Sequence, residues 1–125
     1  MDRPELERVR EIALALPEVN ERLSHGAPCF FIRDKKTLCY YHDNHHDDGR
    51  LCLWVPAPAG VQEDVVRLEP DRFFVPPYVG HRGWIGVHLD IDPDWGEIAG
   101  ILEDAYRLVG PKTLVKLLDA EPAQD

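Results

Sequence analysis

The chain has 125 residues, of which 44% are hydrophobic, and its 23 acidic against 14 basic residues give a formal charge of −9. This length and composition fit one globular domain (residues 1–125) and exclude a disordered chain. No apolar run reaches the roughly 18 residues of a membrane-spanning helix, and the first residues lack the apolar stretch of a signal peptide. We therefore expect a cytoplasmic protein without membrane contact. The acidic balance argues against a surface covered in phosphate contacts but allows a local basic face.

The N-terminal part predicts one helix followed by a linker. Apolar residues recur every three or four positions from Leu6 to Leu16, which is typical of a helix with one buried face, and Pro17 ends the pattern. Residues 18–26 are mostly polar, and we expect them to form a linker.

Three short strands are predicted next, over residues 29–32, 37–41 and 51–55. Each is rich in aromatic or β-branched residues, and turn residues separate them. Residues 42–49 form the longer connection, which an Asp-Gly turn signal closes. Because all these connections are short, the strands should pair antiparallel.

The second half predicts a helix, two strands and two further helices. The helix covers residues 61–68, with Val61, Val65 and Leu68 facing the core. The strands cover residues 73–75 and 83–90. In the second strand, two sets of side chains should face opposite sides of the sheet: Trp84, Gly86 and His88 on one, and Ile85, Val87 and Leu89 on the other.

A strong helix signal lies between Asp92 and Gly110. Asp92 suits an N-cap and is followed by Pro93, while an apolar stripe runs as far as Val109. A last short helix is expected over residues 112–118. The whole order is helix, three strands, helix, two strands and two helices. It predicts an α+β two-layer sandwich, in which an antiparallel sheet of about five strands packs against helices.

Five segments, running in order along almost the whole chain, resemble the MmcQ/YjbR-like family: SHGAPCF (24–30), NHHDDGR (44–50), DRFFVPPYVG (71–80), GWIGV (83–87) and AYRLV (105–109) followed by Pro111 and Lys112. The resemblance implies a two-layer α/β sandwich like that of secretion chaperones, and a DNA-binding role through a double-wing motif. It implies no catalytic residues. Cys29 stands where the family often has a small polar residue.

Positive charge concentrates in two windows, residues 24–42 and 72–88. Each window carries a charge of +2, which leaves −13 for the remainder. If both windows meet on one sheet face or rim, they would attract an anion to an otherwise acidic body. The alternative is solvated charge in turns. The candidate DNA- or anion-binding residues are Arg33, Lys35, Lys36, Arg50, Arg72 and Arg82.

Three histidines, His42, His45 and His46, lie among aspartates in one loop and form a candidate ligand loop. Their spacing matches no known metal site, so solvated turn residues are the simpler interpretation, and we expect no metal or cofactor. The sequence also lacks a Gly-x-Ser-x-Gly nucleophile elbow, and the neighbouring Ser24 and His25 do not make a catalytic pair. We therefore expect no enzymatic activity.

The remaining reactive or aromatic residues fit the core. The cysteines are odd in number and lack a CxxC pair, so buried free thiols are expected, with a redox or nucleophilic cysteine as the alternative. The three tryptophans are expected in the core, with stacking on nucleic-acid bases as the alternative.

Three function classes stay open at this point. The first is DNA binding through a local basic face. The second is a protein-binding module similar to secretion chaperones. The third is a metal-binding enzyme that uses the loop from His42 to Asp48. The sequence leaves the oligomeric state open.

Overall fold

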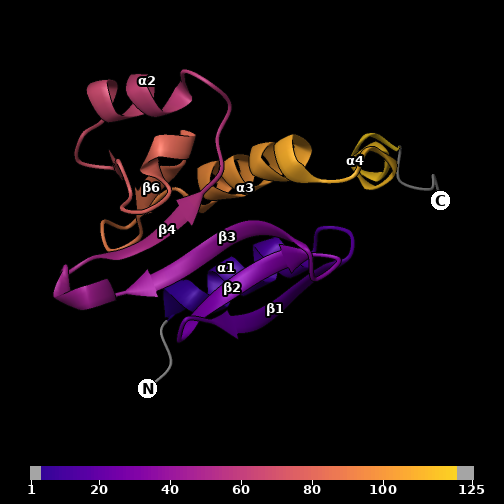
Figure 1. Cartoon of the computed structure of the whole chain (residues 1–125), viewed down its shortest axis with the longest axis horizontal. Coiled ribbons are helices and arrows are strands. Elements are labelled where there is room, and N and C mark those ends of the chain that lie inside the picture. Colours follow the sequence, from indigo (N-terminus) through magenta and orange to yellow (C-terminus); the bar gives the residue numbers. More distant parts are fainter. Residues whose placement is uncertain (1–3, 121–125) are drawn as a thin grey trace.

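A computed structural model describes residues 4–120 of the chain. One antiparallel sheet has the strand order β1-β2-β3-β4-β6-β5, and helices pack against it (Figure 1). The strands are β1 (Val19–Ser24), β2 (Ala27–Ile32), β3 (Lys36–Asp43), β4 (Leu51–Val55), β5 (Phe73–Phe74) and β6 (Ile85–His88). The helices are α1 (Pro4–Leu14), α2 (Val61–Leu68), α3 (Trp95–Val109) and α4 (Lys112–Asp119), with short 3-10 turns η1 (His45–Asp47) and η2 (Gly80–Arg82). The predicted α+β class is confirmed.

The main core lies between the sheet and helices α1 and α3, which share one layer behind it in Figure 1. Strand alternation sends Leu53 and Val55 to this side, where they meet Leu102 of α3. Tyr106, also on α3, is fully buried, and its hydroxyl donates a hydrogen bond to the Pro17 carbonyl at 2.8 Å. We call this face of the sheet the inner face, and the opposite one the outer face.

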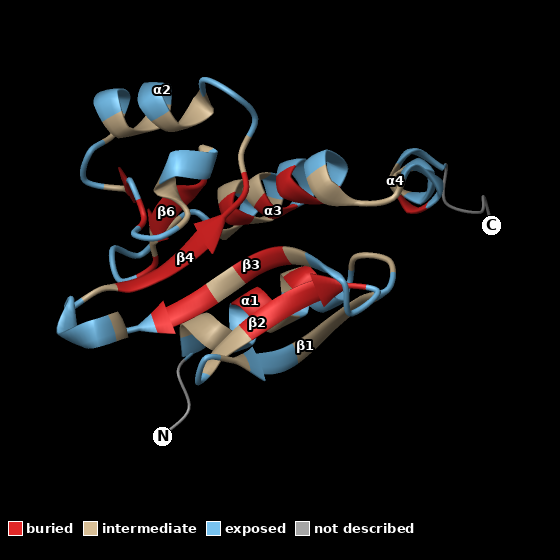
Figure 2. Cartoon of the chain, in the orientation of Figure 1, coloured by how far each residue is buried: buried red, intermediate tan, exposed pale blue. Residues whose placement is uncertain are grey.

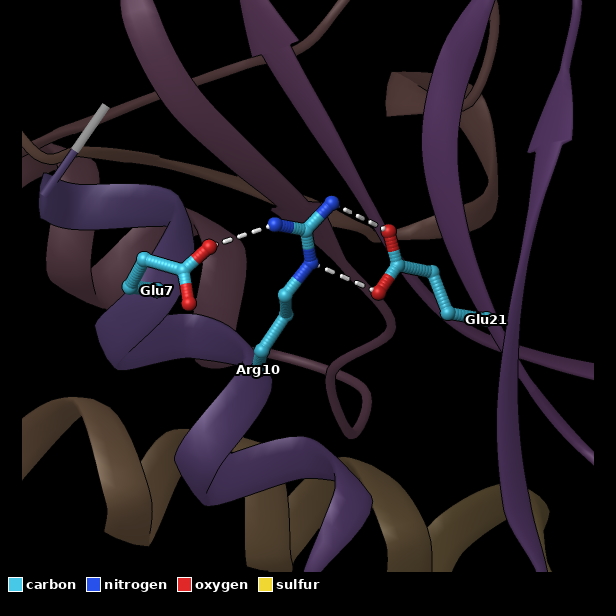
Figure 3. A network of polar contacts seen from close by, with 3 residues as sticks. All are labelled: Glu7, Arg10 and Glu21. Carbon is cyan, nitrogen blue, oxygen red and sulfur yellow. Dashed lines mark hydrogen bonds and ion pairs between the residues drawn. The ribbon is translucent and has the colours of Figure 1, made fainter. Parts of the chain in front are cut away.

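Strand β1 contradicts the predicted linker over residues 18–26. It pairs antiparallel with β2 in a register from Val19↔Ile32 to Ser24↔Ala27. The polar composition of these residues gave no strand signal, because an edge strand with one solvated side needs little apolar surface. Arg10 of α1 also fastens it: Nε and Nη2 donate to the Glu21 carboxylate at 2.8 and 2.9 Å, and Nη1 donates to Glu7 (Figure 3).

Burial differs between the central strands and the edge strand β1. Strands β2, β3 and β4 are largely buried, whereas β1 is half-buried or exposed (Figure 2). The register of β2 and β3 shifts between Phe30 and Phe31, so Leu38 is an extra residue in the ladder. After this bulge, Cys39 and Tyr41 face the inner core, and Tyr40 faces the outer side.

Two predicted details of the helices are wrong. Asp94, not Asp92, is the N-cap of α3, where its carboxylate accepts hydrogen bonds from the backbone N–H groups of Gly96 and Glu97. Asp92 has φ +55° and lies in the preceding turn. Leu68 is exposed rather than inward, because α2 packs through Val65 and Val66. None of the helices within residues 4–120 is both long and apolar enough to cross a membrane.

Candidate functional site

The outer face carries a second, aromatic cluster. Its buried members are Cys52, Trp54, Phe74 and Trp84, with Tyr40 and Val79 packed against them. Strand register explains the grouping, since Tyr40 pairs with Trp54, and Trp54 pairs with Gly86. The Phe74 ring lies directly on Gly86, where an added Cβ would stand 2.3 Å from it. The end of α3 reaches its margin, where Leu108 and Val109 line one hollow with Tyr40 and Trp84.

A hollow of about 410 Å³, which we call the basic groove, opens beside this cluster. Strand β3 pairs with β4 only from Tyr40 onward, so its first half diverges from β4 and leaves space. Lys35 and Lys36 flank the groove from the start of β3, and Arg82 flanks it from η2. The rest of its lining consists of Thr37, Tyr40, Trp84, Leu108 and Val109. The two basic windows of the sequence therefore meet here.

Asp34, next to Lys35, and Asp119, whose partner Arg107 precedes Leu108, are both paired with arginines. Asp34 accepts a hydrogen bond from Arg22 at 2.6 Å, and this contact lowers the pKa of its carboxyl group. On α4, Asp119 pairs with Arg107 at 2.9 Å, which likewise lowers the pKa of Asp119. Within residues 4–120, Lys35, Lys36 and Arg82 form no ion pair.

Two of the candidate arginines lie elsewhere, in ion pairs. Arg33 donates to Glu18 at 3.0 Å across the β1–β2 end of the sheet. Arg72 donates to Glu69 at 2.6 Å and contacts Glu97 of α3 at 2.5 Å. These pairs connect segments of the fold, so neither guanidinium is free for an anion.

Arg50 lies outside the groove and forms neither of these ion pairs. Its guanidinium stacks on the Phe74 ring, 4.0 Å from the centroid. It borders a separate hollow of about 310 Å³ together with His45, His46 and Tyr78. Of the six predicted basic residues, the groove therefore brings together only Lys35, Lys36 and Arg82.

The predicted histidine loop is a compact group of rings. His42, on β3, is 5% exposed, and its ring centroid lies 4.0 Å from that of Trp54 and 4.4 Å from that of His45. Burial lowers the pKa of His42 to about 4, with a further contribution from the neighbouring imidazoles, so its ring is neutral at pH 7. Burial also lowers the pKa of His45. In the part of the chain that the structure describes, no group of three His, Cys, Asp or Glu side chains is arranged to hold a metal ion.

These rings border a hollow of about 360 Å³, which we call the aromatic–histidine pocket. Its lining consists of Ser24, His25, Tyr40, His42, His45, His46, Trp54, Tyr78 and Val79. Tyr40 belongs to the lining of both the pocket and the basic groove, so the two hollows are neighbours that share one ring. Tyr40 and Tyr78 were not among the predicted site residues. Only the alternation of β3, which puts Tyr40 and His42 on one face, could have indicated the pocket.

The cysteines and two of the tryptophans are core residues, as predicted. Cys29, Cys39 and Cys52 are buried free thiols, and burial raises the pKa of Cys29 and of Cys52 to about 12. Trp54 and Trp84 are buried on the outer side, whereas Trp95 is only partly covered by the inner core. Buried thiols with raised pKa values are poor nucleophiles, which does not favour the redox alternative.

Comparison with known proteins places the chain in a family. No curated protein and no solved structure matches it significantly. The model of the family described as YjbR matches residues 14–108, from the end of α1 almost to the end of α3. This match includes the whole sheet, the basic groove apart from Val109, and the aromatic–histidine pocket. The chain belongs to the YjbR family.

Proposed function

We propose that this protein binds DNA through the outer face of its sheet, with phosphate groups at Lys35, Lys36 and Arg82. One observation carries the proposal: two basic windows that are distant in sequence form one groove. Asp34, which precedes Lys35, and Asp119 of α4 are paired with arginines, which reduces their repulsion of an anion.

The acidic remainder of the molecule restricts where DNA can bind. Acidic residues are frequent on α1 and α3, which lie behind the inner face. Their field repels phosphate from that side, while the groove attracts it at short range. A DNA strand should therefore bind on the groove side of the protein only. Its affinity should decrease steeply as the salt concentration increases.

Family membership supports the same proposal, because the resemblance to MmcQ/YjbR-like proteins implies a DNA-binding role. The buried free thiols suit a reducing compartment, so we extend the proposal to a cytoplasmic location.

A protein-binding role is the second candidate, and one feature favours it. Strand β1 is a sheet edge, and Leu23 on it is 69% exposed. An exposed edge can pair with a strand of another chain. A stable dimer in light scattering that Leu23→Lys dissociates would favour this role.

Fluorescence anisotropy with a short labelled DNA strand tests the proposed function. We expect binding at about 50 mM salt that weakens sharply by about 200 mM. Replacing both Lys35 and Lys36 with alanine removes two phosphate contacts. It should weaken binding about tenfold or more, and should make the log–log salt slope less negative by about 0.7 for each lysine.

The matched control is the pair Arg8→Ala and Arg67→Ala, which changes the net charge equally. Both arginines are exposed, on α1 and α2, and neither borders the groove. The control should bind almost as the unmodified protein does. If both double variants weakened DNA binding equally, the effect would be one of overall charge, and this would contradict binding at a specific groove. No binding at the lower salt would end the proposal.

A further inference from the structure

The aromatic–histidine pocket contains buried polar atoms that are poorly satisfied. Among the described residues, the Nε2 atoms of His42 and His45 and the Nε1 atom of Trp54 are buried and lack a well-formed hydrogen bond. The Trp54 N–H interacts with the Cys52 sulfur, which is a weak acceptor. Leaving such a group unsatisfied costs roughly 1–3 kcal/mol. All three residues border one pocket, so a movement of one ring could expose these nitrogens to a single ligand.

The chemistry of the lining selects the type of ligand. No carboxylate, lysine or arginine lines the pocket, and both His42 and His45 have lowered pKa values that favour neutral imidazoles. A charged group would therefore lose its hydration without gaining a counter-charge. A purely apolar group would leave the ring nitrogens unsatisfied. An uncharged planar ring with donors and acceptors on its edge fits both conditions.

The surrounding rings suit a planar ligand. Tyr40 stacks on His42 with an angle of 14° between the rings, and the Trp54 and Tyr78 centroids lie 6.4 Å apart. Tyr78 is 67% exposed and stands at the rim, so most of its surface is free for stacking. The volume of about 360 Å³ is at the small end for ligand sites, enough for one ring system.

His45 packs against the rings of both His42 and Trp54. It lies on η1 rather than on a strand, with ring centroids 4.4 Å from His42 and 4.9 Å from Trp54. The loop that holds it is strained, because Asn44, His46 and Asp47 all have positive φ values, between 49° and 62°. Strain of this kind costs about 1–3 kcal/mol per residue and marks segments that move in function. A turn of the His45 ring would present the edge of His42 to a ligand.

We propose that the aromatic–histidine pocket takes up one unpaired nucleobase of a DNA strand whose phosphates lie in the basic groove. This inference rests on the proposed function. Tyr40 borders both hollows, so a DNA strand in the groove could place one base at the pocket. The base stacks against Tyr78 and forms hydrogen bonds with the nitrogens of His42 and Trp54. The protein thus favours single-stranded or unpaired DNA over duplex.

The test compares a short DNA strand with the same strand carrying abasic sugars, by anisotropy at about 50 mM salt. Both keep their phosphates, so both should bind, but the abasic strand should bind about tenfold more weakly. Tyr78→Ala should remove most of this difference and leave the affinity for the abasic strand unchanged. Leu117→Ala, an exposed change on α4, is the control and should keep the difference.

The outcomes separate the two proposals. Equal affinity of the unmodified protein for both strands would overturn the pocket inference while leaving phosphate binding in the groove intact. The inference would also fail if Tyr78→Ala preserved the full preference for the strand with bases. Absence of binding to either strand would overturn the proposed function, and the inference with it.

Discussion

The two faces of the sheet are built from different residues and differ in what covers them. The core at the inner face is mainly aliphatic, with a few aromatic rings such as Tyr106, and is closed by α1 and α3. The outer face carries the aromatic cluster of Trp54, Phe74 and Trp84, whose margin α3 reaches with its last residues, Leu108 and Val109. On the inner side, close apolar packing stabilises the fold. On the outer side, poorly satisfied ring nitrogens and unpaired cations remain, which is the pattern of a binding surface.

The largest expected difference between the faces concerns stability. Leu53 lies on the central strand β4, fully buried against the inner helices. Leu53→Ala should lower the free energy of unfolding by about 2–5 kcal/mol, because it leaves a cavity. Tyr78→Ala, on the rim of the outer side, should change it by no more than about 0.5 kcal/mol. Urea denaturation measures both, and similar losses would show that the outer rim is part of the core.

A second prediction concerns the contact between Phe74 and Gly86 on the outer face. An alanine at Gly86 would place its Cβ against the ring, so Gly86→Ala should destabilise the protein by up to about 3 kcal/mol. Gly100→Ala, on the exposed side of α3, meets nothing within 4 Å and should instead stabilise by about 0.5–1 kcal/mol. If Gly86→Ala unfolds at the same urea concentration as the unmodified protein, Phe74 is not fixed by this contact.

A smaller effect is expected from pH. The pKa of His42 is about 4 in the folded protein, below its ordinary value near 6.5. The unfolded chain therefore takes up the proton first, and stability is lost as pH falls from about 6.5 toward 4. Between about pH 7.5 and pH 5 the loss due to His42 should be about 2 kcal/mol. His42→Gln should remove this part of the pH dependence; an unchanged pH profile would place the loss elsewhere, for example at His45.

The inner face was largely predictable from sequence, and the outer face was not. Apolar periodicity located α1, α2 and α3, because each buries a stripe that must recur with the helical repeat. Strand β1 was not predicted, because its stability comes from pairing with β2 and from the contact with Arg10, not from its own composition. The cap at Asp94 was displaced by two residues from the expected Asp92, because three aspartates compete for one helix start.

The site residues, too, were only partly predictable from the sequence. Charge counting found both basic windows, but only the structure shows that Arg33 and Arg72 are engaged with glutamates while Lys35, Lys36 and Arg82 are free of ion pairs. Composition cannot reveal this, because ion pairs depend on contacts between distant segments. The contribution of Tyr78 to the pocket depends on a loop conformation with φ +66° that no periodicity indicates.

The contrast between the two faces is tested most directly by mapping a bound DNA strand with amide chemical shifts at about 50 mM salt. We predict that the largest changes occur in residues 35–40 and 82–84 around the groove, continuing to residues 42–46 and Tyr78 at the pocket. Helix α1 should remain unchanged, because the sheet separates it from the outer face. Leu108 and Val109 at the end of α3 line the groove and should also shift. Changes centred on α1 and the first turns of α3, or spread evenly over the surface, would contradict the assignment of binding to the outer face.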